Sequence, residues 1–508
     1  MFEGIKAQDV KDSPPAEKGP LISVNRLTGK AGVFYEKLRY LIDYKEEHTL
    51  RRNAIQRILK RKLSIEKDFR AAAPLLQEMV SGGYLPNNIV SESAAHDIQL
   101  IIDKYLVLQR AGSVESSRII SLAAREIERF LYPHLVDDLV VEAFYQTLAS
   151  RVKYEGDLPE GDVATQIYLG CRISLLDDDR DTLFYSLLNK YFPEFAGQRE
   201  EERFAGHAER FVSALKALDK ELENPLGQRI SARLKNHSIY FSVIRELAIK
   251  YGADSEILFQ SPARLEQEIR KLLAEKYAAQ SEVVSRSGTR AVVYIFLTKI
   301  VLAFILELPY ERLVLGSIDY FALGVNAIFH PVLLLMMVKT IKLPLKQNTN
   351  SIITGVNKIL NNQDIKAIFI KPPSTNAALN VVLAILYAAL FAVSFGFILW
   401  VLNALNFNIV GILLFLFFLT LISYFGFRIR YNAKKWLVTT DNDNFFDLLW
   451  NFFTIPIVRT GRWLSRKFAA VNIFMFFMDF VLETPFKLML QTFDEFISFL
   501  REKKEDYK

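Results

Sequence analysis

The fold of this chain is decided by two apolar stretches, LNVVLAILYAALFAVSFGFILWVL at Leu379–Leu402 and IVGILLFLFFLTLISYFGF at Ile409–Phe427. Neither contains Asp, Glu, Lys or Arg. Each is close to the roughly 20 residues with which an α-helix crosses about 30 Å of hydrocarbon. Because continuous apolar runs lack the alternation of a membrane β-strand, the two stretches predict a transmembrane helical hairpin.

A second pair of apolar stretches precedes this hairpin, at Ala291–Leu308 and Ser317–Val338. Both are long enough to span a membrane, but they carry four ionisable residues, namely Lys299, Glu307, Asp319 and His330. A buried hairpin that never meets lipid is the alternative. We favour spanning, which predicts a multi-pass membrane domain at residues 291–427 with about four transmembrane helices.

Basic residues predict how these helices are oriented. The connection between the second and third spans contains one acid, Asp364, and six lysines: Lys339, Lys342, Lys346, Lys358, Lys366 and Lys371. Lys and Arg in short connections tend to stay on the cytoplasmic side of a membrane. With four crossings, both termini and the Lys-rich connection are therefore expected in the cytoplasm.

The net charge of +6 is unevenly divided along the chain. Residues 1–290 contain 42 Lys plus Arg and 43 Asp plus Glu, whereas residues 291–508 contain 21 and 14. The positive excess lies in the membrane half, which favours contact with anionic lipid headgroups. The near-neutral first half argues against nucleic acid as a partner.

The first half of the chain predicts an all-helical soluble domain. Apolar residues recur every three or four positions through residues 34–290, as expected of a helical bundle. Residues 1–33, rich in Lys, Glu, Asp and Pro, predict a disordered cytoplasmic tail. Ser261 followed by Pro262 marks the start of a last helix that leads into the first span. A single cysteine, Cys171, excludes an intrachain disulfide framework.

Residues 428–508 predict amphipathic helices at the membrane interface. Arg459, Arg462 and Arg466 recur at helical spacing beside aromatic residues, a combination that suits the lipid headgroup zone. The apolar run at 469–482 is short and interrupted by an aspartate, so it is expected to lie flat. A crossing there is the alternative, and it would move the C-terminus to the other side.

No catalytic signature is present in the sequence. The glycine-rich nucleotide motifs, the HExxH zinc motif and the GxSxG motif are missing, and the six histidines lack metal-ligand spacing. We therefore predict no cofactor and no metal, and we favour a non-enzymatic role. A membrane site assembled from distant residues would leave no local pattern, so enzymatic activity stays an open alternative.

The first hairpin contains a candidate polar pathway. Asp319, Asn326 and His330 are separated by seven and four residues, which places them on one face of a helix. In an antiparallel hairpin, Lys299 lies near the depth of Asn326, and Glu307 near the depth of Asp319. Ionisable groups in hydrocarbon usually face a bundle interior or a water-filled cavity. The five side chains thus predict either a pathway for protons, ions or a polar substrate, or a structural hydrogen-bond network.

The third span carries a ridge of small residues at four-residue intervals, namely Ala384, Ala388, Ala392 and Gly396. Such ridges let another helix approach closely, within one chain or between subunits. The sequence therefore predicts helix packing here and favours a homo-oligomer or a protein partner.

Two functions compete on this evidence. The first is a non-enzymatic membrane anchor or scaffold, whose cytoplasmic helical domain binds a protein partner or a membrane surface. The alternative is an oligomeric transporter or channel with its polar pathway in the first hairpin. The size of the soluble domain and the lack of catalytic motifs favour the first.

Overall fold

The structure is a computed structural model, which describes the following residues: 21–22, 47–66, 70–111, 114–193, 195, 208–341, 346–363, 366–372, 377–438 and 445–470. These residues divide into two compact units. The soluble unit comprises Met1–Glu256 and Lys366–Ile370, and the transmembrane unit comprises Ile257–Ile365 and Lys371–Phe474. The predicted all-α fold, a helical soluble region followed by four helices able to span a membrane, is confirmed.

Parts of three predicted segments lie outside the described residues. Of the tail at residues 1–33, only Leu21 and Ile22 are described. The apolar run at 469–482 and the amphipathic helix expected beyond it lie outside the description after residue 470.

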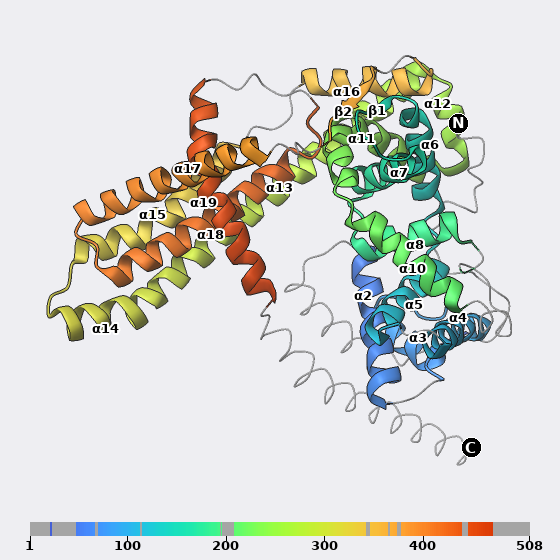
Figure 1. Ribbon diagram of the computed structural model, residues 1–508, viewed down its shortest axis with the longest axis horizontal. Helices are drawn as coiled ribbons and strands as arrows, with labels where there is room; N and C mark the ends of the chain where they lie inside the picture. The colour runs from blue at the N-terminus through green and yellow to red at the C-terminus, as the bar shows by residue number, and fades with distance from the viewer. Residues whose placement is uncertain are drawn as a thin grey trace, which may run out of the picture. The chain divides into compact units, whose positions relative to one another are not determined.

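Amphipathic helices make up the soluble unit, shown in blue to green in Figure 1. They are α2 (Glu47–Leu59), the π-helix η1 (Lys60–Glu66), α3 (Ala72–Ser81), α4 (Glu92–Ala111), α5 (Ser116–Leu131), α6 (Leu135–Ala149), α7 (Glu160–Leu176), α8 (Arg180–Tyr191), α10 (Ala208–Glu223), α11 (Leu226–Tyr251) and the 3-10 helix η2 (Gly252–Asp254), and the unit boundary falls within the short helix α12 (Ser255–Phe259). Their apolar faces meet in a common interior, where the rings of Phe144 and Phe241 stack with centroids 4.3 Å apart. Burial of such side chains is the main favourable term in folding of this unit.

Two glycines let α7 and α11 approach closely. A Cβ on Gly170 would lie 2.5 Å from Cγ2 of Ile230, so no larger residue fits without movement of a neighbour. The backbone N–H of Gly227 donates to Oε1 of Gln166 at 2.9 Å. The two helices are therefore joined by both packing and a buried hydrogen bond.

A short parallel sheet brings part of the Lys-rich connection into the soluble unit. Strand β1 (Val152–Tyr154) pairs with β2 (Ile368–Ile370), with Val152 opposite Ile368. The pairing is extended by a hydrogen bond from the Glu155 N–H to the Ile370 carbonyl at 3.0 Å. Three-residue strands are too short to show a two-residue alternation, so the sequence did not predict them.

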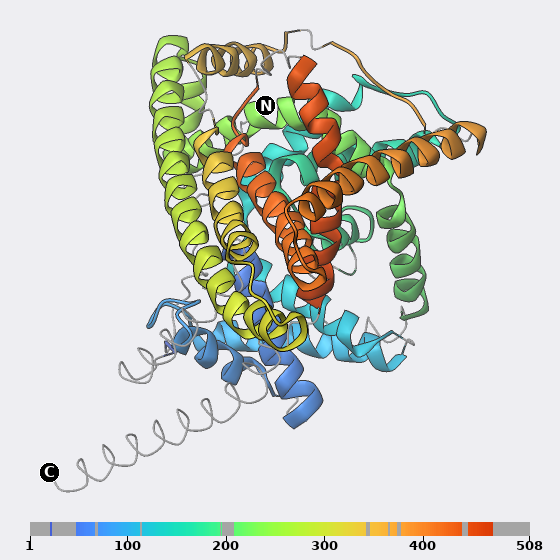
Figure 2. The same cartoon turned by 90° about the vertical axis from the view of Figure 1, so that its left-hand side faces the viewer.

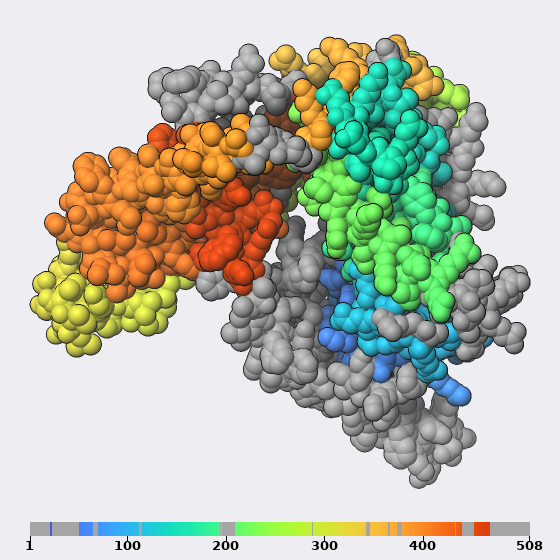
Figure 3. Space-filling model, viewed as in Figure 1, coloured from blue at the N-terminus to red at the C-terminus, as the bar shows by residue number. Residues whose placement is uncertain are grey.

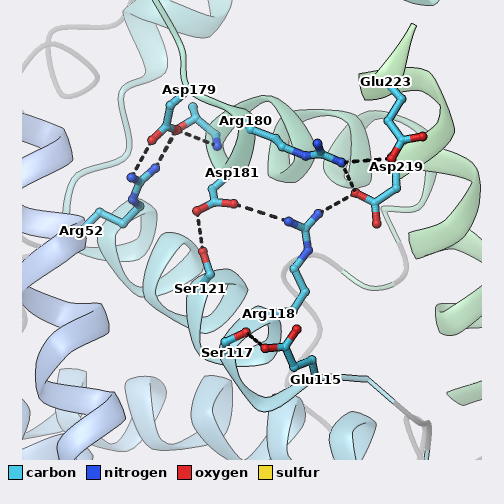
Figure 4. A network of polar contacts seen from close by, with 11 residues as sticks. Arg52, Glu115, Ser117, Arg118, Ser121, Asp179, Arg180, Asp181, Asp219 and Glu223 are labelled. Atoms are coloured by element: carbon cyan, nitrogen blue, oxygen red, sulfur yellow. Dashed lines mark hydrogen bonds and ion pairs between the residues drawn. The ribbon is translucent and has the colours of Figure 1, made fainter. Parts of the chain in front are cut away.

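A polar network ties the start of α8 to three other helices of the soluble unit (Figure 4). Asp179 caps α8 by accepting from the Thr182 N–H at 3.1 Å, and it pairs with Arg52 on α2. Asp181 accepts from Ser121 on α5 at 2.7 Å. The Asp177–Asp179 run therefore lies between two helices, with Asp177 at the end of α7 and Asp179 at the start of α8.

The transmembrane unit begins with one long helix that leads without interruption into the first span (Figure 2). Helix α13 (Pro262–Leu302) continues through the π-helix η3 (Ala303–Glu307), the turn α14 (Leu308–Tyr310) and the π-helix η4 (Glu311–Leu315). Residues 309–316, which connect the first two predicted spans, are therefore helical up to Leu315. Gly316 then turns the chain with φ of +70°, a conformation that favours glycine.

The other helices of this unit are α15 (Tyr320–Lys339), α16 (Lys346–Leu360), α17 (Ala377–Ala404), α18 (Ile409–Ala433) and α19 (Phe445–Ala470). Helix α15 packs between α13 and α18, and α19 packs against both α18 and α17 (Figure 1). The unit boundary lies after Glu256, so α13 belongs to the transmembrane unit.

One side chain joins three segments of the transmembrane unit outside the spans. The amide nitrogen of Asn348 on α16 donates to the Tyr277 hydroxyl on α13 at 2.9 Å and to the Trp436 carbonyl at 2.8 Å. Its amide oxygen accepts from the Val438 N–H at 2.8 Å. A buried amide with these partners holds α16 in place beside α13 and the segment after α18.

Helices α18 and α19 approach each other closely at Gly461. A Cβ on Gly461 would fall directly on the carbonyl of Thr420. Thr420 lies near the middle of α18, so α19 contacts the span well away from its ends. Only glycine fits this crossing.

We predict that Gly461→Ala loosens the contact between α19 and α18. The added methyl group forces backbone movement, which costs about 1–3 kcal/mol in a packed interior. The measurement is the thermal midpoint of the purified protein in detergent, followed by circular dichroism.

The matched control is Gly324→Ala on α15, where no atom lies within 4 Å of the added Cβ. That variant is expected to unfold at or above the wild-type midpoint, since Ala favours helix more than Gly does. Equal midpoints for Gly461→Ala and the wild type would contradict the packing described.

Candidate functional site

A charged hydrogen-bond bridge crosses the first transmembrane hairpin. Lys299 on α13 donates from Nζ to Oδ1 of Asn326 on α15 at 2.5 Å, and Asn326 donates from Nδ2 to Oε1 of Glu307 on η3. The three residues are 3 %, 2 % and 4 % exposed. The ammonium group also lies 4.4 Å from the centroid of the Phe418 ring, a distance typical of a cation–π contact. One amide thus joins a cation to an anion in an apolar interior.

His330 lies one helical turn beyond Asn326 on the same face of α15, as the spacing predicted. It is fully buried. Its Nδ1 lies 3.2 Å from the carbonyl oxygen of Asn326, and its Nε2 lies 3.0 Å from the carbonyl oxygen of Phe415 on α18. The imidazole therefore connects α15 to α18.

Asp319 is not part of this bridge. Its carboxylate caps α15 by accepting from the N–H groups of Phe321 at 2.9 Å and Ala322 at 3.1 Å. An aspartate at the N-cap of a helix is a common structural feature. Four of the five predicted pathway residues therefore come together, and Asp319 serves as a cap.

A second buried glutamate, Glu311, was not among the predicted residues. Its Oε2 accepts from the Asp319 N–H at 3.0 Å, and its Oε1 accepts from Nδ2 of Asn408 at 2.6 Å. In the sequence, Glu311 lies in the connection between the first two predicted spans, where acidic residues are common. Its spacing of four from Glu307 was the one available signal.

Both glutamates lie in π-helical turns. Glu307 ends η3 and Glu311 begins η4. Pro309, which has no backbone N–H, lies between these segments. Single π-turns are rare and occur often at functional sites. The irregular helix brings two carboxylates to the buried side of the hairpin.

The chemistry of this cluster is that of charge pairing and proton exchange. Among the described residues, no group of three or more His, Cys, Asp or Glu is arranged to hold a metal ion. No known protein family, curated protein or solved structure matches the chain. The geometry of the described residues is therefore the basis for the function argued below.

The predicted ridge lies on the outer face of α17. Its members are Ala384, Ala388, Ala392 and Gly396, and all four are exposed. Of the buried residues of α17, Leu390 and Ser394 lie on a different face of the helix, and Leu402 lies near its C-terminal end, beyond the ridge. Side chains of α17 form much of the visible face of the transmembrane unit in Figure 3. Within the described residues, the ridge therefore packs against no helix of the same chain.

The three arginines predicted to contact lipid headgroups lie along α19. The guanidinium of Arg459 lies 4.8 Å from the centroid of the Tyr387 ring on α17. Arg462 and Arg466 are exposed. Their contact with headgroups stays a prediction, since α19 also packs against the middle of α18.

Buried ion pairs connect α2, α5 and α6 in the soluble unit. Glu128 is fully buried and lies within 3.0 Å of His134 Nε2, 2.6 Å of Arg125 Nη1 and 3.7 Å of Arg51 Nη2. Burial alone raises the pKa of Glu128, but the hydrogen bond from His134 and the charges of Arg125 and Arg51 lower it below its ordinary value. Glu128 is therefore the anion that three basic side chains share.

Cys171 is inert by its surroundings. Its side chain is fully buried, and burial raises the pKa of the thiol well above its ordinary value. Cys171 therefore serves as a small packing residue.

We predict that Asn326→Leu destabilises the transmembrane unit by roughly 3–5 kcal/mol, because Lys299 and Glu307 are left as unpaired buried charges. The measurement is the thermal midpoint in detergent. The combined variant Lys299→Met, Asn326→Leu and Glu307→Gln is expected to recover most of the loss. Asn403→Leu, at an exposed position of α17, is the control.

We predict a pH-dependent effect of Glu128→Gln. A lowered pKa means that the carboxylate stabilises the fold above its ordinary value of 4.5, and that the stabilisation is lost as pH falls through the folded-state value. The variant should be less stable than the wild type by about 3 kcal/mol at neutral pH. The difference should shrink in acid.

This difference is measured by chemical unfolding of the full chain in detergent across a pH series. The exposed Glu209→Gln serves as the control on the same unit. A difference that stays constant from neutral to acid pH would show that the charge of Glu128 is not the cause.

Proposed function

We propose that this chain is an integral membrane protein that acts as a non-enzymatic anchor or scaffold. Four transmembrane helices hold it in the bilayer. Its helical soluble unit faces the cytoplasm and binds a protein partner or a membrane surface. Anionic lipid headgroups surround the positively charged membrane half, and a second copy of the chain covers the small-residue ridge of α17.

The observation that carries this proposal is that the polar side chains buried in the first hairpin are bonded to one another. Lys299, Asn326 and Glu307 are buried and use one another as hydrogen-bond partners. A transport pathway requires polar groups that face water or a passing solute. A satisfied bridge instead fixes the relative position of α13 and α15, as an anchor requires.

The continuous helix α13 supports the same proposal. It extends from Pro262, outside the membrane, into the first span with no break at residues 285–289. Asn348 fixes α16 against this helix through Tyr277. The spans are thereby extended by a rigid stem that suits a scaffold.

A transporter or channel is the second candidate, and the π-turns that carry Glu307 and Glu311 favour it. Buried acids in irregular membrane helices are found in proton and ion pathways. Four spans are few for a single-chain carrier, so this candidate requires an oligomer. The ridge of α17 would provide the contact between its subunits.

We predict that the purified protein in liposomes gives no more proton or potassium flux than protein-free liposomes. The fluxes are measured with a pH-sensitive dye and a potassium-sensitive dye. Flux that is abolished in a Lys299→Met, Glu307→Gln variant of equal stability would favour the transporter and contradict the anchor. A photo-crosslinker at Leu139, an exposed side chain on α6, provides the positive readout of partner binding in native membranes.

A further inference from the structure

The strand β2 belongs to the soluble unit, although the chain on either side of it belongs to the transmembrane unit. The chain leaves the transmembrane unit after Ile365 and returns to it at Lys371. Between these points, Ile368–Ile370 pairs with Val152–Tyr154 of the soluble unit. The connection between the second and third spans therefore contributes a strand to the soluble unit.

Backbone groups and a buried side chain hold β2 in place. The Ile368 N–H donates to the Arg151 carbonyl at 2.8 Å, and the Ile370 carbonyl accepts from the Glu155 N–H at 3.0 Å. The Ile370 side chain is 4 % exposed. Alternate residues of a paired strand direct their backbone groups at the neighbouring strand. Ile368 and Ile370 therefore direct their N–H groups at β1, whereas the N–H of Phe369 points away from it.

Short connections lie on both sides of β2. Helix α16 precedes the strand and is bonded to α13 through Asn348. Helix α17, the third span, follows it and begins at Ala377. Residues 361–367 and 371–376 connect the strand to these helices, and a fully extended chain of this length reaches about 25 Å at most. While β2 is paired, α16 and α17 can therefore move only a limited distance away from β1.

We propose that β2 is a tether that holds the soluble unit to the second and third spans. A sheet of two three-residue strands is only marginally stable by itself, so the pairing can open without unfolding of either unit. Opening would leave the chain at residues 256–257 as the remaining connection among the described residues. The tether thus limits how far the soluble unit turns relative to the membrane. This role goes beyond anchoring and does not depend on what the soluble unit binds.

The test compares three proteins in lipid nanodiscs: the wild type, the double variant Ile368→Pro, Ile370→Pro, and Phe369→Pro. Proline has no N–H, so the double variant loses both donors from β2 to β1. Phe369→Pro is the control, because its N–H points away from β1 and its side chain is 55 % exposed. All these changes lie in the connection and leave the helices of the soluble unit as they are.

Spin labels at Gln146→Cys on α6 and Ser285→Cys on α13 report the distance between the units by pulsed electron paramagnetic resonance. Both positions are exposed, and the native Cys171 is buried from the label. The wild type and Phe369→Pro should give equally narrow distance distributions. The double variant should give a distribution at least about twofold broader, since residues 361–376 then act as a flexible linker. Equal widths in all three proteins would overturn the proposal.

Hydrogen exchange of the Glu155 amide provides a second readout within the soluble unit. It should be at least about tenfold slower in the wild type than in the double variant, where the strand that carries its acceptor is released. Equal exchange rates would also contradict the tether. If the double variant does not fold, Ile370→Ser takes its place, because it removes only the buried apolar contact of β2.

Discussion

The transmembrane unit depends on the requirement that every polar group in hydrocarbon finds a partner within the protein. Lys299 and Glu307 would each be costly alone, and Asn326 makes them acceptable by bonding both. The amide has a donor and an acceptor at one end, so it can connect a cation to an anion. This one side chain therefore specifies how α13 and α15 pack.

The same requirement explains the irregular end of the first span. A regular helix through Pro309 would leave a carbonyl without its donor. The π-turns on either side change which residues face inward, and they bring Glu307 and Glu311 to the buried side. Glu311 then bonds the start of α15 and Asn408, which precedes α18. Three spans are joined at their ends by one carboxylate.

The soluble unit uses buried charge in a different way. Its helices are packed through apolar faces, and ion pairs such as Arg51–Glu128 and Arg52–Asp179 connect α2 to other helices. Burial and the neighbouring charges of Arg125 and Arg172 lower the pKa of Arg129 to about 10, yet this arginine still pairs with Asp138. Pairing of this kind adds specificity to a bundle whose apolar faces alone would allow several arrangements.

The sequence by itself determined the helical class, the four spans and the face that carries Asn326 and His330, because hydrophobic length and helical periodicity are local properties. It also singled out the exposed ridge of α17. Only the tertiary structure decided that Asp319 is a cap, that Glu311 joins the cluster and that β2 pairs with β1. Those outcomes depend on which segments meet, and π-turns and three-residue strands leave no periodic signal in the chain.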